Sequence, residues 1–207
     1  MTHNSVPAPP SKLVIASANA GKLREIRAAL DGLPFDVVSQ AALGIAPAAE
    51  TGSTFLSNAL LKARHAAAAS GAAALADDSG LEVDALGGAP GIYSARYAGA
   101  RADDAANNAK LLVALAGKPL EERRARYRCA VAFVEPALDR APVTAEGVWE
   151  GYILEAPRGS GGFGYDPYFW LPELELTAAE LALEEKNRRS HRGAALRALR
   201  ARLAVRA

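Results

Sequence analysis

The sequence predicts an α/β protein in which strands and helices alternate along the chain. Residues 12–17 have a continuous apolar centre, the pattern of a strand that is buried on both faces. A helix follows at once, because apolar residues recur every three or four positions from residue 23 to residue 30. Further along, residues 126–134 alternate between apolar and polar side chains, which indicates a half-buried strand paired antiparallel with residues 143–149.

The other elements follow from the same patterns and from the turn residues between them. Gly32 and Pro34 end the first helix, and Gly71 ends a second helix that begins near Thr54. The remaining elements, in chain order, are a strand at residues 35–38, a short strand that leads into Asp77, a helix at about residues 103–116, and a helix that begins near Ser190.

Composition and charge are those of an ordinary globular protein. The chain has 207 residues, of which 50% are hydrophobic and 23% charged, and its net charge is +1. No strong field therefore favours nucleic acid or an anionic membrane. The last predicted helix has a basic face, which we interpret as solvated helix surface rather than a nucleic-acid site. No apolar span is long enough to cross a bilayer. We expect a cytoplasmic protein with no nucleic-acid or membrane partner.

One domain is expected over residues 12–207, because neither a linker nor an internal repeat divides the chain. Residues 1–11 are polar and rich in Pro, lack an apolar signal core, and are interpreted as a disordered leader. Cys129 is the only cysteine, so no intrachain disulfide forms. We predict that it is a small buried hydrophobe, since no partner for a catalytic thiol is evident.

The chain is organised around the segment Leu75-Ala76-Asp77-Asp78-Ser79-Gly80-Leu81. An apolar strand leads to two adjacent carboxylates, and Gly80 permits a bend that would let Asp77 and Asp78 reach different groups. Carboxylates at the end of a buried strand need a cation or a donor, and hard oxygen ligands suit Mg²⁺. The segment predicts a magnesium site. The alternative is an Asx-turn that caps the strand and starts a hairpin to residues 81–84.

A second polar motif, Ser17-Ala18-Asn19-Ala20-Gly21-Lys22, joins the first strand to its helix. Ser17 or Asn19 can cap this helix, and the free amides of its first turn, its positive dipole end and Lys22 together make a phosphate cradle. The Walker sequence is absent, and an ordinary capped helix is the alternative. Glu50 is a lone acid ahead of the second helix, and its alternative is a solvated charge favoured by the helix dipole.

Glycines gather at two further places. Within residues 158–169, four glycines bracket Phe163, so the backbone can approach a ligand closely while the ring offers a stacking face. The alternative there is a glycine-rich hairpin with core aromatics. Residues 87–91 form a tightly shaped loop ahead of Arg96, which either binds an anion or packs on the surface.

Taken together, these motifs closely resemble the inosine/xanthosine triphosphate pyrophosphatase family, whose members remove non-standard purine nucleotides. The resemblance covers about residues 12–204. The motifs that carry it occur in the family's order: Ser17-Ala18-Asn19-Ala20-Gly21-Lys22, Glu50-Thr51-Gly52, Ala76-Asp77-Asp78-Ser79-Gly80, Gly87-Gly88-Ala89-Pro90-Gly91-Ile92-Tyr93-Ser94-Ala95-Arg96-Tyr97, Gly161-Gly162-Phe163-Gly164-Tyr165-Asp166-Pro167, Glu185-Lys186 and Ser190-His191-Arg192-Gly193.

The resemblance implies an α/β fold with a mixed, twisted central sheet flanked by helices, two lobes with a substrate cleft between them, and a homodimer. It implies that ITP, dITP and XTP are cleaved between the α- and β-phosphates, with Mg²⁺, to the monophosphate and pyrophosphate. Asp78 would be the general base, and Glu50, Asp77 and Asp78 would hold the metal. The residues that would bind substrate are Ser17, Ala18, Asn19, Ala20, Gly21, Lys22, Ser79, Phe163, Gly164, Tyr165, Asp166, Lys186, His191 and Arg192.

Two positions depart from the family pattern. The turn has Ser-Ala-Asn at residues 17–19 where many members have Thr-Gly-Asn, a change that leaves phosphate binding intact. Ala49 stands where a second acid often precedes the counterpart of Glu50, which leaves the number of protein ligands to the metal open.

Two competing hypotheses concern what a protein with these motifs does with a bound nucleotide. One is a non-catalytic nucleotide sensor, against which the intact Asp77-Asp78 pair argues. The other is an enzyme for pyrimidine or modified nucleotides, against which His191-Arg192 argues. The 6-keto oxygen of a purine accepts a hydrogen bond from these side chains or from a backbone N–H. The 6-amino group of adenine is itself a donor and would face another donor.

Overall fold

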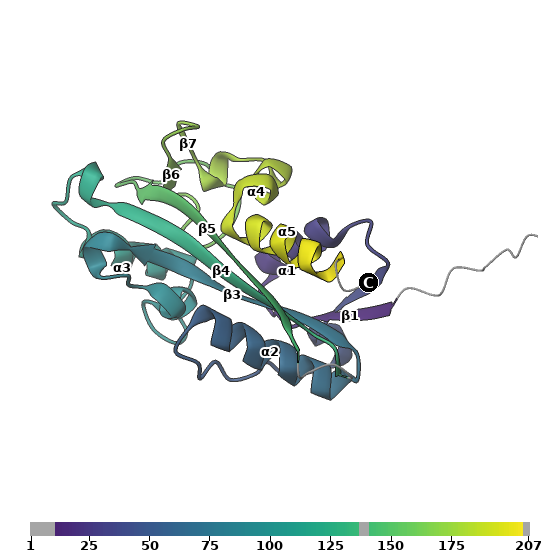
Figure 1. Ribbon diagram of the computed structural model, residues 1–207. Helices are drawn as coiled ribbons and strands as arrows, with labels where there is room; N and C mark the ends of the chain where they lie inside the picture. Colours follow the sequence, from purple (N-terminus) through teal and green to yellow (C-terminus); the bar gives the residue numbers. More distant parts are fainter. Residues whose placement is uncertain (1–10, 137–140, 205–207) are drawn as a thin grey trace, which may run out of the picture.

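A single mixed sheet runs through the protein. The computed structural model describes residues 11–136 and 141–204. Within these residues the sheet has seven strands in the order β2-β1-β3-β4-β5-β6-β7 (Figure 1). Their bounds are β1 Ser11–Ile15, β2 Phe35–Ser39, β3 Ala73–Val83, β4 Arg124–Val134, β5 Val143–Ile153, β6 Phe169–Leu171 and β7 Leu176–Thr177. β1 pairs parallel with β2 and β3, and the other neighbours pair antiparallel. The predicted α/β class and mixed sheet are confirmed.

Helices cover both faces of this sheet. They are α1 Ala20–Leu30, α2 Phe55–Ser70, α3 Asp104–Ala114, α4 Leu183–Arg189 and α5 His191–Ala204. In Figure 1, α2 lies against one face, and α1 and α5 lie against the other. Successive residues of a strand point to opposite faces, so Val14 belongs to the core under α2 while Leu13 and Ile15 belong to the core under α1 and α5. The predicted burial of the first strand on both faces is confirmed, with these three side chains at most 1% exposed.

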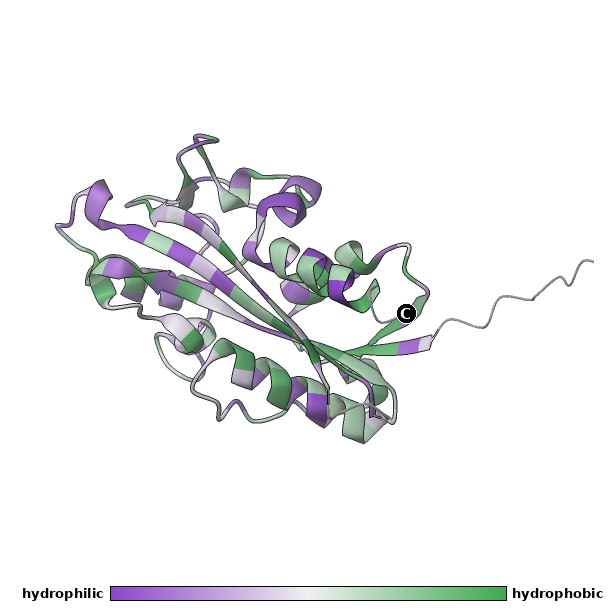
Figure 2. Cartoon of the chain, viewed as in Figure 1, coloured by the Kyte–Doolittle hydropathy of each residue, from purple (hydrophilic) through white to green (hydrophobic). Residues whose placement is uncertain are grey.

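The long strands continue beyond these two cores into a third. It is formed by the far ends of β3, β4 and β5 with α3 and β6, and it includes Leu81, Leu111, Tyr127, Trp149 and Phe169. Figure 2 shows hydrophobic colouring on the strands between α2 and α5 and an alternating pattern toward the other end of β4 and β5. The predicted division into two lobes with a cleft between them stays a prediction.

β3 differs from the prediction. It pairs with β4 without interruption from Ala74 opposite Val134 to Val83 opposite Ala125, so Asp77 and Asp78 lie in the middle of a long strand. The predicted strand end, the bend at Gly80 and the alternative hairpin to residues 81–84 are wrong. Gly80 is needed for close packing instead, because a Cβ there would lie 2.3 Å from the carbonyl oxygen of Gly91.

Smaller differences concern the start of the chain and residues 169–189. Of the predicted leader, residues 1–10 lie outside the described residues, and Ser11 is the first residue of β1. β6, β7 and α4 are additional elements that the patterns did not predict. Cys129 is buried and unpaired, as predicted.

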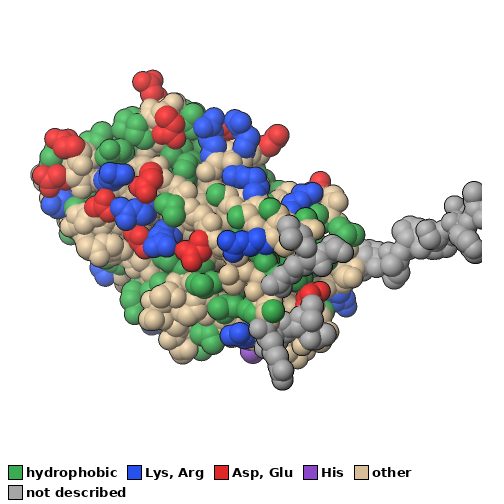
Figure 3. Space-filling view, viewed as in Figure 1, with side chains coloured by type: hydrophobic (Ala, Val, Ile, Leu, Met, Phe, Trp, Pro, Cys, Tyr) green, Lys and Arg blue, Asp and Glu red, His purple; other side chains and the backbone are tan. Residues whose placement is uncertain are grey.

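The surface of β4 and β5 mixes both signs of charge. Figure 3 shows acidic and basic side chains interspersed over this face. Arg126 lies 2.5 Å from Asp84, and Arg128 lies 3.1 Å from Glu146. No helix among the residues described is long and apolar enough to cross a membrane.

Candidate active site

One pocket collects most of the predicted site residues from five parts of the chain. Those that line it are Asn19, Lys22, Glu50, Asp78, Ser79, Phe163, Gly164, Tyr165, Asp166, Lys186, His191 and Arg192. The other predicted residues are Ser17, Ala18, Ala20, Gly21 and Asp77, which lie beside the pocket without lining it. Residues separated by more than 170 positions in the sequence therefore meet around one space.

The start of α1 forms one wall of the pocket. Asn19 is the N-cap, and its side-chain oxygen accepts a hydrogen bond from the Lys22 amide at 3.0 Å. The Ser17 hydroxyl in turn accepts from the Asn19 amide at 3.2 Å. Of the two predicted caps, Asn19 caps the helix and Ser17 holds the cap. The first turn presents amides without intrahelical acceptors, and Lys22 adds a full positive charge beside them.

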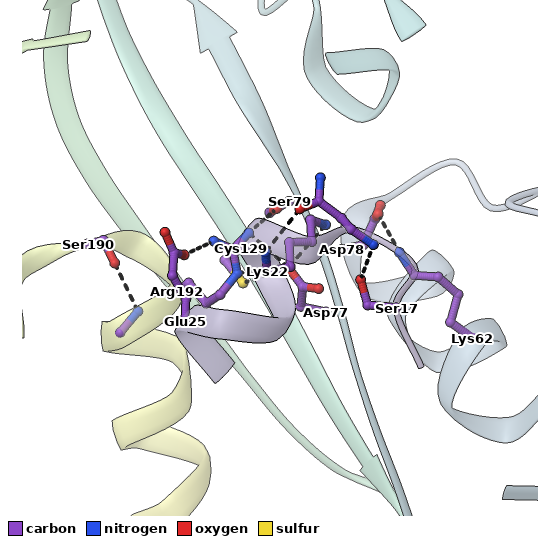
Figure 4. A network of polar contacts seen from close by, with 12 residues as sticks. Ser17, Lys22, Glu25, Lys62, Asp77, Asp78, Ser79, Cys129, Ser190 and Arg192 are labelled. Carbon is purple, nitrogen blue, oxygen red and sulfur yellow. Dashed lines mark hydrogen bonds and ion pairs between the residues drawn. The ribbon is translucent and has the colours of Figure 1, made fainter. Parts of the chain in front are cut away.

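Asp77 is fully buried between two cations (Figure 4). Its Oδ2 lies 3.1 Å from Lys22 Nζ and 3.0 Å from Arg192 Nη2. Burial opposes its ionisation, but the charges of Lys22 and Arg192 prevail and hold the pKa of Asp77 far below its usual range. Its Oδ1 is buried without a hydrogen-bond partner among the residues described. Asp77 is therefore an anion that fixes two cations on one face of β3.

Asp78 points to the opposite face of β3 and meets different partners. Its Oδ1 accepts from Lys62 Nζ at 2.8 Å, and its Oδ2 accepts from Asn58 Nδ2 at 3.2 Å. Burial raises the pKa of Asp78, and the nearby charge of Lys62 offsets this only in part. A carboxylate with a raised pKa at the wall of a pocket has the properties of a general base.

Glu50 joins this second group from the loop before α2. It lies 3.0 Å from Lys62 Nζ and 2.8 Å from Arg96 Nη1. Burial raises the pKa of Glu50, but Lys62 and Arg96 outweigh it and the net pKa is lowered. The carboxylates of Glu50 and Asp78 therefore converge on one ammonium group.

This donor set fits the magnesium ion that the family resemblance implies. Glu50 and Asp78 both line the pocket and converge on one cationic point, so together they offer two hard oxygen ligands. Among the residues described, no group of three or more His, Cys, Asp or Glu could hold a metal by itself. Mg²⁺ typically takes one or two carboxylates, with water and substrate phosphates completing its shell. The pocket fits an ion that arrives with a phosphate ligand.

The opposite wall of the pocket is built around Phe163 and two buried cations. Lys186 Nζ lies 4.8 Å from the centre of the Phe163 ring, and Arg192 Cζ lies 5.7 Å from it. Asp166 accepts from Lys186 at 2.6 Å and from the Phe163 amide at 2.8 Å. The ring packs closely on α1, since a Cβ on Gly21 would lie 2.4 Å from Phe163 Cδ1.

His191 and Arg192 begin α5 and face the same space. The His191 ring stacks on Tyr127, with ring centres 4.7 Å apart. Burial, with the charge of Arg192 adding to it, lowers the pKa of His191 well below 6.5, so its imidazole is neutral. Arg192 donates to Ser79 Oγ at 2.8 Å and also forms an ion pair with Glu25. Part of the donor capacity of Arg192 is thus already used within the protein.

Two charged residues that organise this site are not among those predicted from the sequence. Glu25 is buried on α1, where it pairs with both Lys186, at 2.7 Å, and Arg192. Lys62 on α2 bridges Glu50 and Asp78. Each has a weak signal in the sequence: Glu25 lies three residues after Lys22, and Lys62 lies one turn after Asn58 on a helix otherwise rich in Ala.

The fold and the pocket define a class of α/β protein that binds an anionic ligand between cationic side chains and a pair of carboxylates. The chain belongs to the Ham1 family, whose sequence profile matches residues 13–202.

Similar proteins match this chain over nearly the whole length of both chains. The chain is 57% identical over 192 residues to a dITP/XTP pyrophosphatase of Methylococcus capsulatus, covering 93% of this chain and 96% of that one. It is 55% identical to a dITP/XTP pyrophosphatase of Pectobacterium atrosepticum over 91% and 95% of the two chains. The structure of a HAM1 protein from Coxiella burnetii superposes with a TM-score of 0.85 at 47% identity, covering 94% and 98%.

Proposed function

We propose that the protein is a Mg²⁺-dependent pyrophosphatase that hydrolyses ITP, dITP and XTP to the monophosphate and pyrophosphate, and so removes non-standard purine nucleotides. The observation that carries the proposal is the arrangement of one pocket. It places the cationic start of α1 beside the Asp78–Glu50 carboxylates, and an aromatic wall beside both. The 57% identity to a protein with that name supports the same assignment.

The triphosphate would lie at the start of α1. The first-turn amides of Ala20 and Gly21, which Asn19 does not engage, would donate to phosphate oxygens, and the Lys22 ammonium would neutralise charge that builds on the leaving pyrophosphate. Asp77 contributes indirectly, because its carboxylate holds Lys22 and Arg192 in place. We therefore assign Asp77 the task of orienting these cations. Its carboxylate does not line the pocket, and its predicted role as a metal ligand stays a prediction.

Asp78 would act as the general base. Its carboxylate takes a proton from water as the water oxygen attacks the α-phosphorus. The bond from the α-phosphorus to the bridging oxygen breaks, and pyrophosphate departs with that oxygen. When Mg²⁺ is bound, Glu50 and Asp78 would hold it, and the ion supplies charge neutralisation of the phosphates. Lys62, which spans the two carboxylates, keeps them together.

The base would be read at the other wall. Phe163 offers a stacking face, which adds affinity for any base, while selectivity needs directional donors. His191 is neutral and carries one N–H, and Arg192 keeps those N–H groups that Asp77, Glu25 and Ser79 do not use. Donation to a 6-keto oxygen favours inosine and xanthosine over adenine.

The test is pyrophosphate release from a panel of nucleoside triphosphates with and without Mg²⁺. We expect ITP, dITP and XTP to exceed ATP by orders of magnitude, and activity to disappear with a chelator and return when Mg²⁺ is added. Equal turnover of ATP and ITP would contradict the substrate assignment. Pocket binding of ITP without pyrophosphate release would instead identify a sensor.

We also propose that the protein acts in the cytoplasm as a homodimer, and the homodimer rests on the family resemblance. The chain has a mass of 21.5 kDa. Sedimentation at micromolar concentration should therefore show a species of twice that mass, and a monomer would contradict the proposal.

A further inference from the structure

We infer that Asp104 and Asn108 on α3 are positioning residues that hold Phe163 over the pocket, through the backbone of Gly164. Asp104 Oδ2 accepts from the Gly164 amide at 2.6 Å, and Asn108 Nδ2 donates to the Gly164 carbonyl oxygen at 2.9 Å. Both polar groups of one peptide residue are thus held by side chains one helical turn apart. The role assigned to Phe163 rests on the proposed function.

The segment that carries Phe163 needs such an external hold. Gly159, Gly162 and Gly164 all have positive φ values, between 62° and 76°. Residues 155–162 are exposed and lie outside helices and strands. Glycine-rich backbone has high conformational freedom, so the ring position depends on a few anchors. One anchor is local, the Phe163 amide on Asp166, and the pair on α3 holds the next residue from the other side.

α3 also holds the facing wall, which makes it a common support. Asn107, between the two positioning residues, donates to Ala95 O at 3.2 Å and accepts from the Ala98 amide at 2.8 Å. Tyr165 OH donates to Ser94 O at 2.8 Å. The residues around Arg96 and the residues around Phe163 are therefore fixed relative to one another by α3 and by the direct Tyr165–Ser94 bond.

The helix start offers a matched control. Asp103 is the N-cap of α3, and its Oδ1 accepts from the Ala106 amide at 2.8 Å. Asp103→Ala weakens the same helix end but removes no bond to Gly164. Asp104 is exposed, so Asp104→Ala leaves the core intact. Asp104→Asn keeps an acceptor for the Gly164 amide and is the conservative variant.

The first experiment measures amide hydrogen exchange on the free protein, which does not depend on any activity. We expect faster exchange in peptides covering residues 161–168 in Asp104→Ala and in Asn108→Ala. In Asp103→Ala the acceleration should be confined to α3. Unchanged exchange of residues 161–168 in Asp104→Ala, or the same acceleration there in Asp103→Ala, would overturn the inference.

The second experiment compares ITP hydrolysis by Asp104→Ala, Phe163→Ala and the double variant. The bond from the Gly164 amide to a carboxylate is charge-assisted, so we expect KM to rise about tenfold in Asp104→Ala with kcat nearly unchanged. Asp104→Asn should recover most of the loss.

Because Asp104 acts through Phe163, the double variant should match Phe163→Ala alone. Effects that multiply would show direct contact of Asp104 with substrate and overturn the inference. Absence of ITP turnover in the parent would refute the proposed function while leaving the exchange result standing.

Discussion

Asp77 and Asp78 are adjacent in sequence yet have opposite electrostatics, because an extended strand turns neighbouring side chains to opposite faces. Asp77 meets Lys22 and Arg192 and has a lowered pKa, whereas burial raises the pKa of Asp78 beside Lys62. Two carboxylates with diverging pKa values are a common basis for separate roles. Here one is a fixed anion and the other is suited to exchange a proton.

At Asp78 we expect Asp78→Asn to lower kcat for ITP by about 100-fold or more, because the amide cannot accept the proton of water. In the parent, the rate should fall as pH drops through the pKa of Asp78, which lies above the usual value of 3.8. The pKa of Glu50 is lowered, so its titration lies further to the acid side. Asp84→Asn, on an exposed carboxylate outside the pocket, is the control. Retention of activity within a few-fold in Asp78→Asn would exclude the general-base role.

At Lys22 we expect Lys22→Ala to weaken ITP binding by about tenfold to 100-fold while inosine binding changes little, because the ammonium group lines the pocket where the proposed function places the triphosphate. Arg192 remains beside Asp77, so the buried carboxylate keeps one partner and the fold persists. Calorimetric titration of both ligands makes the comparison. Lys118→Ala, in a surface pair with Glu122, should change neither affinity. Equal losses for ITP and inosine would remove the phosphate role.

At the scale of elements, the position where each helix begins, and the spacing of residues one turn apart, bring the side chains of the site together. α1 begins at the cap Asn19, so Lys22 and Glu25 face the pocket region one turn apart. α2 begins with a capping box at Thr54. This start fixes which face of the helix carries Asn58 and Lys62, and that face is directed at Asp78. Caps and periodicity are local signals, which is why these helix starts could be predicted from the sequence.

The close approach of α1 to the Phe163 segment gives an element-level prediction. In Gly21→Ala the new Cβ would lie 2.4 Å from the Phe163 ring, so the ring must move. Ala is favoured over Gly in a helix by about 0.5–1 kcal/mol, so the free energy of unfolding should not fall by more than about 1 kcal/mol. We therefore expect KM for ITP to rise without a loss of stability, measured by kinetics and urea unfolding. In a Phe163→Ala background the same substitution should have no effect on KM, and a persisting effect would place the cause elsewhere.

At the scale of the whole molecule, the sequence predicts local structure better than contacts between residues far apart in the chain. The motifs around Lys22, Asp78 and Phe163 could be recognised one by one, and twelve of the seventeen predicted site residues line the pocket. The path of β3 differs from the prediction because Asp-Asp-Ser-Gly has the composition of a turn in isolation, whereas ten register pairs with β4 extend the strand through it. Glu25 and its two cations lie more than 160 positions apart, and no local pattern reports such a pairing.

The folded molecule keeps His191 neutral in its interior, and this links stability to pH. Its pKa lies well below 6.5 in the native state because of burial and the adjacent Arg192. The unfolded chain binds a proton near pH 6.5, so below that pH the unfolded state holds more protons and stability falls. The contribution of His191 is fully present above pH 6.5 and declines by about 1.4 kcal/mol per pH unit below it.

We therefore expect the free energy of unfolding of the parent to fall more steeply between about pH 6.5 and pH 5 than that of His191→Gln, by about 1.4 kcal/mol per pH unit. The raised pKa values of Asp78 and Asp166 act with the opposite sign in both proteins, so the difference between the two slopes isolates His191. Urea unfolding at several pH values measures it. If His191→Gln keeps the slope of the parent, His191 is charged in the folded protein, and a second positive charge then lies beside Arg192 in the pocket.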